Sequence, residues 1–435
     1  SLNRWLSRTR GGIAVVTCIM AVIMAAMSGI IGGEVVLLGL IALPQMLRLG
    51  YDQRLAVGTI CAGGSLGAMI PPSIVLIMYG LVTETSVKAL FTASFLPGFM
   101  LAGFYVVYIL VITRLRPDFA PLAEPLPGDP EGGQKFLLFL TFLLTVATGF
   151  TVLLLLRAVF MFATGQSRLA EGMPGVALGM PHHIPWFLAV IALCAGLILG
   201  VLGRGRLRQS WDMGKGLVAP LTVVGVVLGS IYGGITGITE AAGMGVIAVL
   251  LIGLMRRSLN IGMITDSLAR TVSATGSIMW VTLGATALAG AYTIAGGPAF
   301  IARSILVADI SPMGVVLAMM LIFLVLGALM DWVGIVLLVM PVFLPVVQKL
   351  PVEELGLIGQ IEAQHVAVWF GVLFAMNMQV SFLSPPFGPA AFFLKSVAPP
   401  EITLAQIFRG FLPFVALQLL ALAVMLAWPS IVTLL

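Results

Sequence analysis

Two long apolar runs constrain the fold of this chain more than any other feature of its sequence. Residues 136–156 and 185–202 contain no charged side chain and have about the 20-residue length that carries a helix across a bilayer core. Backbone groups in lipid must find their partners within the segment, and these runs lack the alternation of β-barrel strands. The sequence therefore predicts an all-α polytopic membrane protein with about a dozen helical segments.

The composition agrees with this prediction. Apolar residues make up 60% of the chain and charged residues 9%, whereas soluble domains carry about 25% charge. The net charge of +5 does not indicate nucleic-acid binding, because basic residues flank apolar segments, where they set orientation. Cys18, Cys61 and Cys194 lack CxxC spacing and are predicted to be small buried side chains. No cleavable signal peptide and no P-loop are predicted.

The basic residues also predict a path through the membrane. Residues 11–28 and 35–46 are separated by a glycine-rich break and flanked by arginines, which predicts a re-entrant hairpin that opens to the cytoplasm. Residues 315–330 and 333–347 are predicted to form a second hairpin, entered from outside. The resulting path places all 22 Lys and Arg residues on the cytoplasmic side except Lys88, Arg157, Arg168, Arg303 and Lys349.

Two parts of the chain resemble one another. In each, a glycine lies 11 residues before a proline, as Gly33 before Pro44 and Gly334 before Pro345. Each predicted hairpin is followed by an apolar segment that a double proline interrupts. Because the hairpins are predicted to enter from opposite sides, the repeat is inverted, and inverted repeats with broken helices are typical of secondary transporters.

We divide the chain by the roles that this repeat predicts. The two hairpin-and-broken-helix units are the halves of a transport unit, and connecting helices form a scaffold between them. The predicted parts are residues 1–85 (first half), 86–312 (scaffold), 313–397 (second half) and 398–435 (C-terminal helix).

The helix breaks are the predicted binding regions. A break inside a bilayer leaves N–H and C=O groups unpaired, which is tolerated where they line a cavity. Freed carbonyls and hydroxyls suit a hard cation such as Na⁺, and half-helix N-termini favour anions. Candidates near the first break are Ser28, Gly29, Glu34, Gly64, Ser65, Gly67, Pro71, Pro72 and Ser73. Candidates near the second are Asp331, Asn377, Ser381, Ser384, Pro385, Pro386 and Gly388.

The polar candidates differ in what they indicate. Asn377, Ser381 and Ser384 share one helix face, although each hydroxyl is equally explained by a bond to its own helix backbone. Asp331 is a carboxylate between apolar segments, which predicts a functional role for it. Glu34 is a second carboxylate of this kind, and its position leaves both a functional and a structural role open. His182 and His183 lack further ligands, so no transition-metal site is predicted.

Several motifs resemble the large membrane subunit of tripartite ATP-independent periplasmic (TRAP) transporters, the DctM-like proteins. They cover nearly the whole chain in the family order. The matching stretches are residues 41–44 with 50–52, 64–67 with 70–74, 232–234 with 239–242, 330–331 with 341–345, and 384–388.

The resemblance implies an elevator-type fold in the bacterial inner membrane, Na⁺ as coupling ion and no other cofactor. It also implies a small four-helix membrane subunit and a periplasmic protein that delivers a carboxylate, such as a C4-dicarboxylate. The sodium-binding regions of the family carry over to Ser28, Gly29, Gly64, Ser65, Asp331, Asn377, Ser384, Pro385 and Pro386, and a structural motif to Thr239 and Glu240.

The chain departs from the family pattern in three places. The pair of helices at about 136–203 looks like an insertion. Residues 30–34 replace a run of small hydroxyl residues, so the first ion site is expected to be built differently. The family has further helices before the first hairpin, so the chain resembles a truncated member.

Three other functions fit the sequence less well. A membrane enzyme needs a catalytic set, and the histidines lie at predicted membrane edges. A channel would show an oligomeric pore instead of two inverted hairpins. A stand-alone Na⁺- or H⁺-coupled carboxylate transporter differs from the favoured function in lacking neighbouring genes for the two partner proteins.

Overall fold

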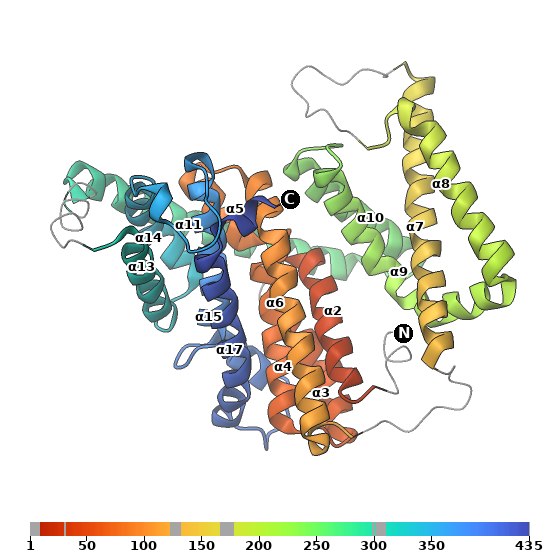
Figure 1. The fold of residues 1–435 in the computed structure, drawn as a ribbon, viewed down its shortest axis with the longest axis horizontal. Helices are drawn as coiled ribbons and strands as arrows, with labels where there is room; N and C mark the ends of the chain where they lie inside the picture. The colour runs from red at the N-terminus through yellow and green to blue at the C-terminus, as the bar shows by residue number, and fades with distance from the viewer. Residues whose placement is uncertain are drawn as a thin grey trace. The chain divides into compact units, whose positions relative to one another are not determined.

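The structure is a computed structural model that describes residues 9–29, 32–121, 132–165, 178–297, 300 and 310–434. Within these ranges the regular structure is entirely helical, which confirms the all-α prediction (Figure 1). The chain divides into two compact units. One comprises the described residues of Ser1–Val16 and Leu122–Leu259, and the other those of Thr17–Pro121 and Asn260–Leu435. Residues 30–31 of the predicted hairpin tip, Arg168 and Arg303 lie outside the described residues.

Seven helices of the described chain are long and apolar enough to cross a membrane, as expected of a polytopic membrane protein. They are α6 (Val87–Leu115), α7 (Gly132–Ala163), α8 (Ile184–Gly196) with its flanking turns, α9 (Arg204–Tyr232), α10 (Ile238–Met255), α15 (Val366–Leu383) and α17 (Leu404–Ala427). Four shorter apolar helices are α2 (Gly12–Ser28), α5 (Ile74–Thr83), α13 (Pro312–Gly327) and α14 (Trp332–Val347).

The unit that contains the predicted insertion is built from α7, α8, α9 and α10. Helix α7 packs against α8 and α9, and α9 packs against α10. Helix α9 begins at Arg204, well before the apolar run that starts at Leu217. Arginine is a good helix former, so the helix continues beyond the apolar segment. The loop residue Leu178 connects α7 with the end of α9. Its N–H donates to Gly233 O (2.7 Å), and its carbonyl oxygen accepts from Arg157 Nη1 (2.6 Å).

The other unit begins with the first hairpin and the first broken helix. Helix α2 ends at Ser28, and α3 (Gly33–Arg48) returns along α4 (Gln53–Ser65). Asp52 caps α4 by accepting bonds from the N–H groups of Arg54 and Leu55. After Ser65 the chain forms a short 3₁₀ turn, and Ser73 caps the start of α5 at Ile74. Pro71 and Pro72 cannot donate backbone bonds, which explains the interruption. The predicted first break is confirmed.

The second hairpin and broken helix follow in the same order. Helices α13 and α14 form the arms, and the Asp331 carboxylate caps α14 by accepting from Val333 N at 3.3 Å. Helix α15 ends at Leu383, and α16 (Pro389–Lys395) begins after the break at residues 384–388. The Pro71–Pro72 and Pro385–Pro386 peptide bonds are both cis. The second break also lies where the sequence predicted it.

The first hairpin and broken helix pack against the second hairpin and broken helix. Helix α3 packs against α16, and α14 packs against α5, so each hairpin contacts the short helix after the other's break. Helices α15 and α17 run alongside α4 and α6 (Figure 1). Every residue of α15 except Ala367 is buried, which makes α15 the centre of this unit. The remaining helix, α11 (Ile261–Ile294), contacts α14.

Candidate ion and substrate sites

The tip of the first hairpin lies against the first helix break. Gly29 has φ +59°, and a Cβ added there would overlap the carbonyl oxygen of Pro72. The Gly29 carbonyl in turn accepts a bond from Ile74 N at 3.3 Å. A side chain at position 29 is therefore unfavourable for two reasons, the positive φ of the backbone and the overlap with Pro72 O. The structure thus brings together two predicted site residues, Gly29 and Pro72.

Glu34 is a buried carboxylate at this tip. Its side chain is 2% exposed, and Ser28 Oγ donates to Glu34 Oε1 at 2.5 Å. Gly67 leaves room for the carboxylate, because a Cβ there would lie 3.3 Å from Oε1. The second oxygen, Oε2, is buried and has no hydrogen-bond partner within the described chain. Since an unpaired buried polar atom is unfavourable, this oxygen is able to accept a further hydrogen bond or a cation.

The remaining candidates near the first break form packing contacts or hydrogen bonds within the chain. A Cβ on Gly64 would lie 3.1 Å from Val35 N, so this glycine permits the close approach of α3 and α4. Ser73 Oγ donates to Ala68 O at 2.6 Å. Ser65 is fully buried, and its hydroxyl contacts side chains of α15 and α17.

Ser65 belongs to a buried polar cluster that sequence reasoning missed. Its hydroxyl donates to Ala62 O at 2.8 Å, lies 3.3 Å from Gln379 Oε1 and accepts from Gln418 Nε2 at 3.2 Å. Gln379 Nε2 and Gln418 Oε1 are buried without partners in the described chain. Two glutamines inside apolar helices were the available signal, because polar side chains at such positions usually connect helices. The cluster ties α4, α15 and α17 together.

At the second break, the shared polar face of α15 contacts the second hairpin. Asn377 Nδ2 donates to Met320 O at 2.9 Å, and its Oδ1 is buried without a partner in the described residues. Ser381 Oγ donates to Asn377 O, and Ser384 Oγ donates to Val380 O. Both hydroxyls therefore bond their own helix, the alternative that the sequence left open. Their oxygens keep free lone pairs for a ligand.

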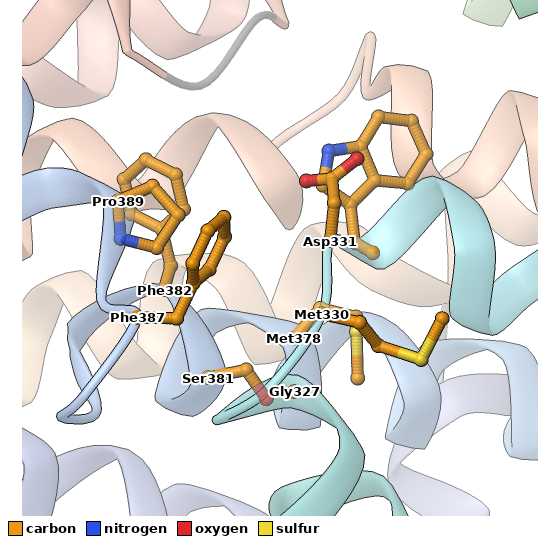
Figure 2. Close-up of a pocket in the computed structure, with 9 residues that line it drawn as sticks. Gly327, Met330, Asp331, Met378, Ser381, Phe382, Phe387 and Pro389 are labelled. Carbon is orange, nitrogen blue, oxygen red and sulfur yellow. The ribbon is translucent and has the colours of Figure 1, made fainter.

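A cleft separates the second hairpin tip from the second break. It has an empty volume of about 250 Å³, which includes space open to solvent. Figure 2 shows Asp331 at its rim, Phe382, Phe387 and Pro389 on the opposite side, and Ser381 and Gly327 at its base. The lining residues are Gly327, Met330, Asp331, Trp332, Met378, Ser381, Phe382, Phe387 and Pro389.

The other predicted residues of the second break do not line this cleft. Pro385 and Pro386 are exposed, and Gly388 N donates to Ser384 O at 2.8 Å. A Cβ on Gly388 would lie 2.7 Å from the Phe408 ring, so this glycine permits close packing of the break on α17. Asp331 and the base of the cleft thus offer oxygen ligands at different depths.

Thr239 and Glu240 lie in the first turn of α10, in the other unit. A negative charge at a helix N-terminus is favourable, so this position suits a structural role for Glu240. No group of three or more His, Cys, Asp or Glu residues that could hold a metal ion occurs within the described ranges. Cys18, Cys61 and Cys194 are buried, as predicted.

Residues 2–431 match the family of the tripartite ATP-independent periplasmic transporter, DctM component. The chain is a member of the DctM family. It is therefore a multi-pass large permease component and not an enzyme, and the resemblance seen in its motifs is confirmed.

Three relatives illustrate the range of the family. The C4-dicarboxylate TRAP transporter large permease protein DctM of Pseudomonas aeruginosa is 24% identical over 99% of this chain and 78% of its own length. The ectoine TRAP transporter large permease protein TeaC of Halomonas elongata is 23% identical over 98% of this chain and 78% of its own. The isethionate TRAP transporter permease protein DctMQ of Oleidesulfovibrio alaskensis is 23% identical over 99% of this chain and 53% of its own.

Proposed function

We propose that this chain is the permease of a Na⁺-coupled transporter that imports a small organic acid across the bacterial inner membrane. A periplasmic binding protein would deliver the acid, and a small four-helix membrane subunit would complete the assembly. The observation that carries the proposal is the pairing of each hairpin with a helix break. Each place also holds a buried oxygen atom without a partner in the described chain, Glu34 Oε2 at the first and Asn377 Oδ1 at the second.

The oxygen atoms at the two breaks support sodium as the coupling ion. The first break offers Glu34 Oε2 and the Ser28 hydroxyl, and the second offers Asn377 Oδ1 and the Ser381 hydroxyl. Asp331 adds a carboxylate at the second hairpin tip. Carboxylate, amide and hydroxyl oxygens are hard ligands, and binding of Na⁺ would offset the cost of leaving them unpaired.

The exchanged helix contacts support an inverted repeat and movement as one body. Helix α3 with α16, and α14 with α5, are the pairs that a twofold relation between the repeats would generate. The Ser65, Gln379 and Gln418 cluster links the two broken helices in the interior. An elevator-type movement, in which the hairpins and broken helices shift together, is the mechanism we favour.

The names of the relatives support an organic acid as the cargo, since they include C4-dicarboxylate, ectoine and isethionate transporters. Neighbouring genes that encode a small four-helix protein and a secreted binding protein would support the tripartite assembly. Uptake by this chain alone would instead favour a stand-alone transporter.

Sodium dependence is tested in proteoliposomes that contain the complete transporter and its loaded binding protein. Uptake should disappear when choline replaces Na⁺ at constant ionic strength and return when Na⁺ is restored. A potassium-for-choline exchange controls for nonspecific salt effects. Uptake driven equally well by a proton gradient without Na⁺ would refute sodium coupling.

A further inference from the structure

Exposed arginines gather at the end of the two-hairpin unit that is predicted to face the cytoplasm. They are Arg48, Arg54, Arg114, Arg116 and Arg409. The turn after α6 is bonded to the start of α4, because Asp52 N donates to Phe119 O at 2.9 Å. Helix α17 lies against α4 at the same level, since a Cβ on Gly410 would lie 2.9 Å from Arg54 O. The ends of α4, α6 and α17 thus carry their arginines to one place.

This end has a net positive charge. None of these arginines forms an ion pair with an acid within the described residues. The acids at this end are fewer than the arginines, namely Asp52, Asp118 and Glu401. Asp52 already accepts from two N–H groups at the start of α4. Basic side chains next to a membrane-spanning helix attract the anionic lipids of the cytoplasmic leaflet.

Arg114 and Arg116 form the basic end of α6. Arg114 lies in the last turn of the helix, and the Arg116 guanidinium lies 5.6 Å from the centre of the Phe119 ring. The hydrogen bond from Asp52 N to Phe119 O fixes the turn that carries this ring. A guanidinium that stacks on a ring can still donate from its edge, and its planar array of N–H groups fits a phosphate.

An apolar stripe on α6 leads to these arginines. Val107, Val111 and Leu115 are 58%, 47% and 74% exposed and share one helix face through their i, i+4 spacing. Arg114 follows Val111 by three residues and lies on the same face. The eight-residue stripe rises about 12 Å, close to the ~15 Å of one leaflet's hydrocarbon. Membrane orientation explains arginines at this end, but it does not explain why Arg114 is aligned with the stripe.

We propose that the end of α6 is a binding site for an anionic phospholipid. The phosphate accepts hydrogen bonds from Arg114 and Arg116, and an acyl chain lies along Val107, Val111 and Leu115. A headgroup with net negative charge is favoured over a choline headgroup, whose quaternary ammonium the surrounding arginines repel. The site goes beyond the transport function proposed above and depends neither on the coupling ion nor on the solute.

The test is native mass spectrometry of the full chain, purified in detergent and titrated with dioleoylphosphatidylglycerol or dioleoylphosphatidylcholine. The two lipids have the same acyl chains and differ in headgroup charge, so the ratio of their affinities measures recognition of that charge. The first phosphatidylglycerol should bind roughly five- to thirtyfold more tightly than the first phosphatidylcholine, the range for one or two arginines next to an anionic lipid.

Three variants locate the binding. Arg114→Gln combined with Arg116→Gln removes both charges and should remove most of the preference for phosphatidylglycerol. Its thermal unfolding midpoint without added lipid should match the parent, because both side chains are exposed. Lys88→Gln is the matched control, since Lys88 is an exposed cation in the first turn of α6, at its other end. Val111→Ser interrupts the stripe and should weaken the binding of both lipids alike.

The outcomes separate a lipid site from the alternatives. A preference for phosphatidylglycerol that is lost in the double arginine variant and kept in Lys88→Gln supports the site. Equal binding of the two lipids, an unchanged preference in the double variant, or the same loss in Lys88→Gln overturns it. Displacement of phosphatidylglycerol by inorganic phosphate, with no effect of Val111→Ser, means that the arginines bind free phosphate, which also overturns it. Each of these results leaves the proposed transport function unaffected.

Discussion

Gly327 sets the distance between the second hairpin and the central helix α15. It is the last residue of α13, and a Cβ added there would overlap both Oγ and Cβ of Ser381. The serine hydroxyl can rotate away, but its Cβ is fixed to the backbone of α15. Ser381 is 5% exposed, so it has little room to retreat. Gly327→Ala must therefore displace the end of α13 or part of α15.

The expected cost follows from two opposing effects. Overpacking a well-packed interior costs about 1–3 kcal/mol, because side chains and backbone must shift. Replacing a helical glycine by alanine returns about 1 kcal/mol of helix propensity. The net effect of Gly327→Ala should be a loss of about 0–2 kcal/mol in the free energy of unfolding, which is about 1–3 kcal/mol relative to a glycine-to-alanine change in a helix without such an overlap. The same displacement should weaken the Na⁺ dependence of thermal stability, since it disturbs the base of the cleft.

The free energy of unfolding is measured by denaturant titration of the detergent-solubilised protein in Na⁺ buffer. Gly103→Ala is the control, because Gly103 lies inside α6 and a Cβ there meets no atom within 4 Å. The control should be neutral or slightly stabilising. If Gly327→Ala is as stable as Gly103→Ala, the close approach of α13 and α15 is wrong, and so is the geometry of the cleft base.

Three further perturbations test the proposed ion sites and their movement. Asp331→Asn keeps a good helix cap, so the protein should purify normally, whereas its transport should need more Na⁺; unchanged Na⁺ dependence would exclude Asp331 as a ligand. Glu34→Gln removes a buried charge but can still accept the Ser28 bond. It should therefore raise the free energy of unfolding in Na⁺-free buffer by about 1 kcal/mol and reduce stabilisation by Na⁺, and a loss of stability in that buffer would contradict this reasoning. Ser384→Cys places a thiol at a half-buried position while all three native cysteines are buried. Its labelling by a membrane-impermeant maleimide should differ between Na⁺ and choline, and identical labelling in an active transporter would argue against a moving unit.

The helix breaks could be predicted because their causes are local. Pro71 and Pro72 lack the N–H that would continue a helix, and Gly29 adopts a conformation that other residues rarely take. The boundaries were less predictable where the sequence is not apolar, as at Arg204, because apolar patterns mark the membrane-facing part of a helix and not its full length.

The partners of individual polar residues could not be predicted, because they depend on contacts between distant parts of the chain. Ser65 meets Gln379 and Gln418 across sequence separations of 314 and 353 residues, and no local pattern contains that information. The sequence did place Asp331 and Ser381 in one region. It could not show that one lies at the rim and the other at the base of the cleft.

The burial of α15 has a consequence for how the chain is inserted during synthesis. Helix α15 bonds to both earlier and later parts of the chain, since Tyr79 Oη donates to Ala367 O and Trp369 Nε1 donates to Met425 O. Helix α17 leaves the ribosome after α15, so the face of α15 that it covers stays open until residues 404–427 have been made. Because the Trp369 N–H on that face has its acceptor on α17, lipid is a poor substitute for the missing helix. We expect α15 to reach its final position only after α17 has been inserted, so the centre of this unit is assembled among the last steps of biogenesis.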